Sequence, residues 1–95
     1  MPDSDMLRQL EHIIAERKAN PQANSYTSEL FSKGRAKIAQ KVGEEATEVI
    51  VAALAQSREE QLGEVADLFY HTLVLMADMD ISLDDINAEL TKRHR

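Results

Sequence analysis

Residues 57–79 read SREEQLGEVADLFYHTLVLMADM, and the prediction for the rest of the chain starts from this segment. Ser57 and Glu60 have the spacing of a capping box, in which each side chain binds the other residue's backbone N–H at the start of a helix. Apolar residues then recur at helical spacing. They are Leu62, Val65, Ala66, Phe69, Leu73 and Met76. We therefore predict a long α-helix over residues 58–79.

This predicted helix is apolar on more than one side. Leu68, Val74 and Leu75 widen the apolar face until it nearly encircles the helix. Such a helix is buried on several sides. A chain of 95 residues has a poor ratio of core to surface, and oligomerisation is a common remedy. The sequence therefore predicts that a second copy of the chain covers part of this helix.

The remaining segments also read as helices. A stripe formed by Ile38, Val42, Ala46, Val49 and Ala53 predicts a second long helix over residues 36–56. Shorter helices are expected from near Asp3–Asp5 to residue 19, over residues 27–33 and over residues 83–92, with Asn20-Pro21 and Gly34 as breaks. The expected fold is an all-α bundle of about four to five helices, one domain over residues 1–95, completed by homodimerisation.

Composition and charge exclude several classes of protein. The net charge is −6, with no broad basic face, which argues against general nucleic-acid binding. No apolar run approaches membrane-spanning length, and the N-terminus lacks the pattern of a secretory signal. The absence of cysteine fits a reducing compartment. The expected location is the cytoplasm, without a membrane partner.

Five acidic residues on the two long predicted helices form the most informative chemical pattern. Glu44, Glu45 and Glu48 form an E-E-x-x-E cluster, and Glu64 and Asp67 form an E-x-x-D cluster. At about 100° per residue, each cluster lies on one side of its helix. If the helices pack side by side, the carboxylates converge and repel one another unless a hard cation neutralises them. Oxygen-only ligands suit Mg²⁺, with Mn²⁺ as an alternative.

Two lysines share the helix face of the first acidic cluster. On a helical wheel that starts at Glu44, Lys37 falls near 20° and Lys41 near 60°. Ammonium groups beside metal-binding acids are what a metal–polyphosphate substrate requires. The chain has no phosphate-binding glycine loop and no cysteine or serine-elbow nucleophile. If the protein is an enzyme, its simplest nucleophile is a metal-activated water.

A less specific interpretation of the same residues stays open. Glu and Lys at helical spacing usually form a solvated surface. However, Glu64 and Asp67 lie on a helix otherwise rich in core residues, and buried carboxylates must be paired or bind metal. His71, one turn after Asp67, is either a further ligand or, more in keeping with an oxygen-only site, a hydrogen-bonded core histidine.

These patterns resemble those of the phosphoribosyl-ATP pyrophosphatase family, within the all-α NTP pyrophosphatase, or MazG-like, superfamily. The acidic pattern is moderately specific by itself, and the segments around it make the resemblance strong. The matching segments are residues 10–17 (LEHIIAER), 25–27 (SYT), 33–34 (KG), 37–48 (KIAQKVGEEATE), 64–75 (EVADLFYHTLVL) and 82–85 (SLDD).

The resemblance implies a function and a role for each matching residue. The reaction would be Mg²⁺-dependent hydrolysis of 1-(5-phosphoribosyl)-ATP to 1-(5-phosphoribosyl)-AMP and pyrophosphate, the second step of histidine biosynthesis. A separate cyclohydrolase would act on the product, and the enzyme would be a homodimer. The catalytic residues would be Glu44, Glu45, Glu48, Glu64 and Asp67, of which all but Glu44 bind metal. Glu44 would be a further ligand or the base that orients water.

The resemblance also assigns residues to the substrate. Lys37 and Lys41 would contact phosphates, a role that rests mainly on their place on the helical wheel. Tyr26, Thr27 and Lys33 would shape the substrate pocket.

Three other classes of function are to be weighed against this one. A house-cleaning pyrophosphatase would use the same metal ligands on ordinary or non-standard nucleoside triphosphates. A non-catalytic helical dimerisation module would carry the acids only as solvated groups. A ferritin-like di-iron protein is less consistent, because the chain lacks the Glu-x-x-His pairs that such sites use.

Overall fold

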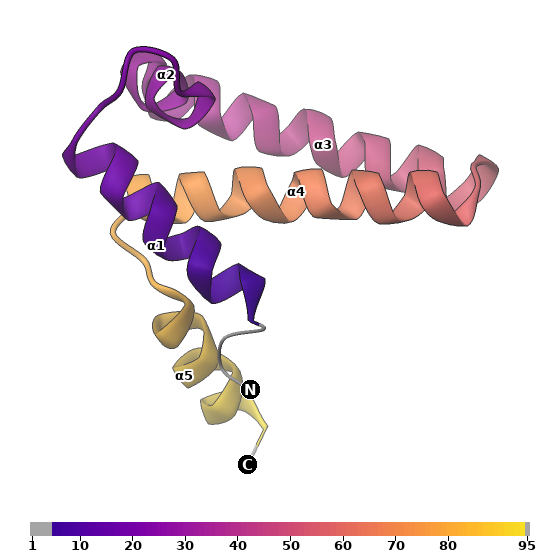
Figure 1. The fold of residues 1–95 in the computed structure, drawn as a ribbon. Coiled ribbons are helices and arrows are strands. Elements are labelled where there is room, and N and C mark those ends of the chain that lie inside the picture. Colours follow the sequence, from indigo (N-terminus) through magenta and orange to yellow (C-terminus); the bar gives the residue numbers. More distant parts are fainter. Residues whose placement is uncertain (1–4, 95) are drawn as a thin grey trace.

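The computed structural model describes residues 5–94, and these residues form an all-α fold of five helices (Figure 1). The helices are α1 (Met6–Ala19), α2 (Tyr26–Lys33), α3 (Arg35–Ala55), α4 (Arg58–Asp78) and α5 (Leu83–Arg93). Every predicted helix is present, and each described boundary lies within one or two residues of its predicted place. The all-α prediction is therefore confirmed.

Local signals explain where the first two helices begin and end. The Asp5 carboxylate accepts a hydrogen bond from the Arg8 N–H and caps α1; the earlier of the predicted starts, at Asp3, lies outside the described residues. Helix α2 begins at Tyr26, one residue before the prediction, because the Ser25 hydroxyl accepts from the Ser28 N–H at 3.1 Å. Gly34 alone separates α2 from α3, with a φ of 95° that favours glycine.

Helices α3 and α4 form a long antiparallel hairpin that dominates the molecule (Figure 1). The predicted capping box closes its tip. The Ser57 hydroxyl accepts from the Glu60 N–H at 3.2 Å, and the Glu60 carboxylate accepts from the Ser57 N–H at 3.1 Å. The Gln61 amide also donates to the backbone carbonyl of Ala52 across the hairpin at 3.1 Å. Hydrogen bonds thus hold the tip where apolar packing is sparse.

The hydrophobic core lies at the other end of the hairpin, where α1 and α2 cover it (Figure 1). Its buried side chains come from four helices and include two with no exposed surface, Ile38 and Val74. The core cluster consists of Ile14, Leu30, Ile38, Leu73, Val74 and Met76. Leu73, Val74 and Met76 of the 57–79 segment are therefore buried within the chain itself.

Apolar residues of that segment before residue 70 remain exposed in the single chain. Leu62 is 58% exposed, Val65 37% and Phe69 47%, although they belong to the same apolar stripe as the buried Leu73 and Met76. On α3, Leu54 is 82% exposed. The reason is that α1 and α2 reach only one end of the hairpin. The stripe is continuous in sequence, but this chain covers only part of it.

Helix α5 follows a second capping box, in which the Ser82 hydroxyl accepts from the Asp85 N–H. The Glu11 carboxylate accepts from the Leu83 N–H at 2.7 Å and so connects α1 to the start of α5. No side chain of helix α5 is fully buried, although Leu83 at its start packs against the core. None of the helices between residues 5 and 94 has both the length and the apolar character needed to cross a membrane.

Candidate functional site

Three carboxylates converge where α3 and α4 lie side by side. Glu45 and Glu48 come from the middle of α3, and Glu64 comes from the first half of α4. Each offers an oxygen, and these oxygens all lie within 4.8 Å of one another. Three of the five predicted acids therefore form a compact cluster, because the antiparallel hairpin brings the two acidic motifs to the same level.

The electrostatics of the cluster favour a bound cation. The pKa of Glu64 is raised, first by partial burial and then by the negative charges of Glu48, Asp67 and Glu45. Both effects penalise the ionised carboxylate. A divalent cation among these oxygens would remove the penalty, and an all-oxygen donor set is the one that Mg²⁺ and Mn²⁺ prefer.

Asp67 lies at the border of this cluster. It follows Glu64 by one helical turn, and its charge contributes to the raised pKa of Glu64. Its side chain is exposed, and it is not one of the three whose oxygens lie within 4.8 Å. Its backbone carbonyl accepts a hydrogen bond from Nδ1 of His71 at 2.8 Å.

The Glu44 carboxylate contacts residues outside this cluster. Its carboxylate accepts from the Gln40 amide at 2.8 Å and lies 3.4 Å from Nζ of Lys41. The Gln40 hydrogen bond, followed by Lys41 and Lys37, lowers the pKa of Glu44. The structure thus places Glu44 beside the cluster rather than inside it. Gln40 was not anticipated, although its spacing of four residues from Glu44 could have indicated the pair.

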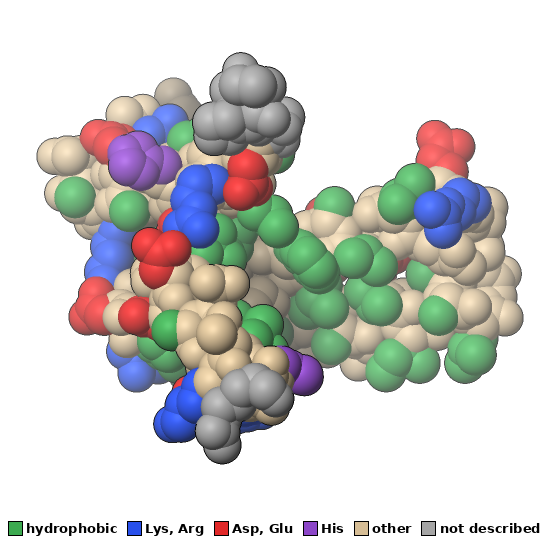
Figure 2. Space-filling view, turned by 90° about the horizontal axis from the view of Figure 1, so that it is seen from below, with side chains coloured by type: hydrophobic (Ala, Val, Ile, Leu, Met, Phe, Trp, Pro, Cys, Tyr) green, Lys and Arg blue, Asp and Glu red, His purple; other side chains and the backbone are tan. Residues whose placement is uncertain are grey.

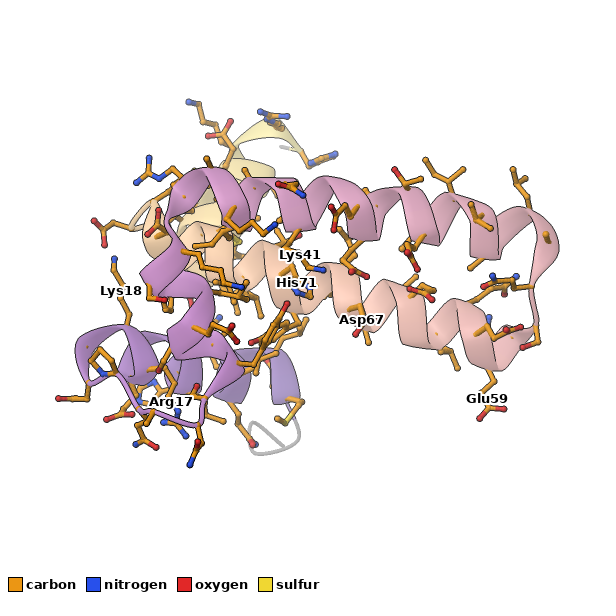
Figure 3. The ribbon with its side chains drawn as sticks, turned by 90° about the horizontal axis from the view of Figure 1, so that it is seen from above. Arg17, Lys18, Lys41, Glu59, Asp67 and His71 are labelled. Carbon is orange, nitrogen blue, oxygen red and sulfur yellow. The ribbon has the colours of Figure 1, made fainter. Side chains whose placement is uncertain are left out.

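Lys41 lies next to the cluster on α3 (Figure 3). Its Nζ is 3.8 Å from a carboxylate oxygen of Glu45, in addition to its contact with Glu44. The pKa of Lys41 is raised, first by the charge that Tyr26 carries when ionised, against the opposing effect of burial, and then by Glu44 and Glu45. The ammonium group is therefore close to both the acidic cluster and Tyr26.

The predicted substrate residues of α2 separate into two groups. The Tyr26 hydroxyl is 3.0 Å from Nε2 of His71, and the Thr27 hydroxyl is hydrogen-bonded to that of Tyr70. These bonds tie the start of α2 to the helix that carries Glu64. Lys33, at the far end of α2, is 3.3 Å from Glu29 on its own helix, and in the described residues no ion pair joins it to the acidic cluster.

His71 is buried, with 6% of its surface exposed, and both ring nitrogens have partners in the protein. This is the hydrogen-bonded core histidine that the sequence favoured over a metal ligand. The hydroxyl of Tyr70 is hydrogen-bonded to that of Thr27, a contact that the sequence did not indicate. Local spacing cannot reveal this bond, since 43 residues separate the partners.

Comparison with known proteins identifies the family. The sequence model described as Phosphoribosyl-ATP pyrophosphohydrolase matches residues 7–94. Three proteins named Phosphoribosyl-ATP pyrophosphatase illustrate the similarity. One from Clostridium novyi (strain NT) is 46% identical over 95 residues, which are 100% of this chain and 86% of the relative. One from Geotalea daltonii is 50% identical over 91 residues (96% and 86%), and one from Bacillus cereus (strain 03BB102) is 53% identical over 85 residues (90% and 79%). Since the family model spans nearly the whole chain, the protein belongs to the phosphoribosyl-ATP pyrophosphohydrolase family.

Proposed function

We propose that this protein hydrolyses 1-(5-phosphoribosyl)-ATP to 1-(5-phosphoribosyl)-AMP and pyrophosphate, the second step of histidine biosynthesis, in the cytoplasm. The observation that carries the proposal is the convergence of Glu45, Glu48 and Glu64 within a chain that belongs to this family over residues 7–94. A compact group of carboxylates beside a lysine suits a substrate that carries a chain of phosphates.

We propose Mg²⁺, with Mn²⁺ as a substitute, as the cofactor of this site. Glu45, Glu48 and Glu64 would hold it, and Asp67, one turn along α4, would complete the set. The residues fit the ion because they offer only carboxylate oxygens and because their mutual repulsion raises the pKa of Glu64. When bound, Mg²⁺ supplies charge neutralisation for phosphate oxygens and lowers the pKa of a bound water.

The neighbouring residues would bind the substrate and handle the proton. Lys41 and Lys37 carry positive charge beside the cluster and would contact phosphate oxygens as pyrophosphate departs. Glu44, whose lowered pKa keeps it ionised at neutral pH, would orient the attacking water or act as a further ligand.

The residues of α2 would form part of the substrate pocket. Tyr26 and Thr27 are tied to α4 and would form one wall. Lys33, at the end of the same helix, would lie at the edge of the pocket and help to shape it.

We also propose that the active form is a homodimer. Hydrophobic side chains spread over the α3/α4 hairpin on the face shown in Figure 2, and Figure 3 shows Lys41 and Asp67 from the opposite side. Val49 and Ala53 of α3 and Leu62 and Val65 of α4 line a groove in the hairpin. An exposed apolar surface of this extent is typical of a protein interface, and a second copy offers the same surface in return. Sedimentation equilibrium should give twice the chain mass.

Pyrophosphate release tests the proposed reaction. The protein is incubated with phosphoribosyl-ATP, with and without Mg²⁺, beside a panel of ordinary nucleoside triphosphates. Rapid Mg²⁺-dependent release from phosphoribosyl-ATP alone is expected. Release from the ordinary triphosphates instead would favour a house-cleaning pyrophosphatase, and no release from any substrate would favour the non-catalytic module.

Matched variants connect the activity to the cluster. Glu48→Gln removes one carboxylate of the cluster and should lower kcat/KM by at least about 100-fold, in line with the loss of one charge-stabilising group. Glu59→Gln makes the same chemical change near the tip of the hairpin, far from Asp67 in Figure 3, and should leave activity unchanged. Equal losses of kcat/KM in both variants would show that the reaction does not depend on the cluster.

A further inference from the structure

The hydrogen bonds of His71 define the state of its ring. Nδ1 lies 2.8 Å from the backbone carbonyl oxygen of Asp67, and Nε2 lies 3.0 Å from the hydroxyl of Tyr26. A carbonyl oxygen only accepts, so Nδ1 carries a proton. In the neutral ring, Nε2 then accepts from the Tyr26 hydroxyl. One buried side chain thus joins the helix of the acidic cluster to the first residue of α2.

Aromatic contacts fix the same group of residues in position. The rings of Tyr26 and Tyr70 are stacked, with centroids 6.1 Å apart and an interplanar angle of 26°. The His71 ring meets both edge-on, at 5.9 Å from Tyr26 and 4.9 Å from Tyr70. Such offset and edge-to-face pairs are preferred arrangements. Tyr26 is therefore held by one hydrogen bond and two ring contacts.

The held side chain is nevertheless accessible. Tyr26 is 48% exposed, whereas His71 behind it is 6% exposed. Tyr26 also lies close enough to Lys41 for its ionised form to be the largest influence on the pKa of that lysine. Because its proton is directed to His71, the outward side of Tyr26 offers a ring surface and an oxygen lone pair next to the phosphate-binding lysine.

We propose that His71 is a positioning residue that fixes Tyr26 at the edge of the carboxylate cluster, where Tyr26 packs against the nucleoside part of the substrate. This inference rests on the proposed function. Its role is in binding, because the hydrogen bonds of His71 go to the Asp67 backbone carbonyl and to Tyr26 rather than to a carboxylate of the cluster. Loss of the hydrogen bond should therefore change KM more than kcat.

Two substitutions at position 71 separate the two hydrogen bonds. In His71→Asn, the amide nitrogen replaces Nδ1 and still donates to the Asp67 carbonyl, but no atom reaches Tyr26. In His71→Gln, the longer side chain places its amide near the position of Nε2 and can accept from the Tyr26 hydroxyl again. Tyr26→Phe removes the same bond from the other side. It keeps the ring of a half-exposed residue, so its folding should be preserved even if position 71 tolerates little change.

Steady-state kinetics with phosphoribosyl-ATP and thermal unfolding of the same samples test this role. Tyr26→Phe and His71→Asn should each raise KM about two- to ten-fold, the effect of one hydrogen bond, with kcat within about two-fold of the wild type. His71→Gln should restore most of the loss. The double variant Tyr26→Phe/His71→Asn should be no worse than either single variant, because both remove the same bond.

Other outcomes would overturn the inference. An unchanged KM in Tyr26→Phe and His71→Asn, with only a lower unfolding temperature, would show a merely structural role. A structural role would also follow if His71→Gln behaved like His71→Asn. If the wild-type protein does not hydrolyse phosphoribosyl-ATP, the proposed function fails together with the inference. If the wild type is active and KM is unchanged in Tyr26→Phe and His71→Asn, only the inference fails.

Discussion

The two ends of the α3/α4 hairpin are built from the same two helices and similar apolar residues, but only one end is buried. At the end covered by α1 and α2, Ile38 and Val74 have no exposed surface. At the other end, Leu54 is 82% and Leu62 58% exposed. The acidic cluster lies between these two regions, in the middle of α3 and the first half of α4.

This difference shows what an apolar pattern does and does not specify. Spacing determines which side of a helix avoids water. It does not determine whether the cover comes from the same chain or from another copy. The buried end should therefore control the stability of the single chain, and the exposed end should control association.

The largest effect is expected from truncation within the buried end. Ile38→Ala should lower the free energy of unfolding by about 2–5 kcal/mol, because it leaves a cavity among fully buried neighbours. Leu54→Ala, the matched change at the exposed end, should change it by no more than about 0.5 kcal/mol in dilute protein. Urea unfolding at low concentration measures both. Similar losses would show that the two ends do not differ as described.

Association should respond to a charge at the exposed end. Leu62→Glu places a carboxylate in the groove of the hairpin and should shift the protein from dimer to monomer. The control is Leu90→Glu, the same change at a half-exposed leucine of α5. Sedimentation equilibrium distinguishes the two masses. A dimer that persists in Leu62→Glu and dissociates in Leu90→Glu would move the interface to α5.

Between the two ends, metal binding should stabilise the hairpin. Mg²⁺ at ten times its Kd should stabilise the wild-type protein by about 1.4 kcal/mol. Glu64→Gln should lose most of this gain. Without metal, the same variant should be at least as stable as the wild type, because it removes one of the mutually repelling charges. Thermal unfolding with Mg²⁺ and with a chelator measures both effects, and Glu59→Gln serves as the control.

The smallest effect concerns the tip of the exposed end. Hydrogen bonds from the backbone and hydroxyl of Ser57 lower the pKa of Glu60. The capping box therefore contributes its full stability above about pH 4.3, the ordinary pKa of a glutamate. That contribution is lost as the pH falls through the lowered pKa. The protection of the amides of residues 57–61 against exchange, corrected for the intrinsic exchange rate at each pH, should therefore fall in acid before that of the buried end, and Glu60→Gln should remove this pH dependence. Ser57→Ala should cost about 1 kcal/mol at neutral pH.

Much of the fold followed from local rules. Caps at Ser57 and Ser82, the break at Gly34 and the helical period gave helix positions within one or two residues of those observed. The convergence of Glu45, Glu48 and Glu64 also agrees with the expectation from motif spacing and an antiparallel pair.

Other features depend on contacts between distant segments. The Glu44 side chain is hydrogen-bonded to Gln40, although other neighbours lie equally close on the helical wheel. The wheel alone does not show which of these neighbours Glu44 contacts. The bonds of Tyr26 to His71 and of Thr27 to Tyr70 span 45 and 43 residues, so they become visible only once α2 is placed against α4. Which residues of the apolar stripe are buried and which are exposed likewise depends on where α1 and α2 lie.

The single-residue joint at Gly34 has a mechanical consequence. Helix α2 has eight residues and is therefore about 12 Å long, with Gly34 at one end and Tyr26 at the other. A small rotation at Gly34 therefore produces a large displacement of Tyr26. A rotation of about 10° at the joint would move Tyr26 by about 2 Å over this length. That displacement exceeds the tolerance of its 3.0 Å bond to His71. The backbone conformation at Gly34, outside the acidic cluster, thus affects how Tyr26 is aligned with His71 and with the acidic cluster.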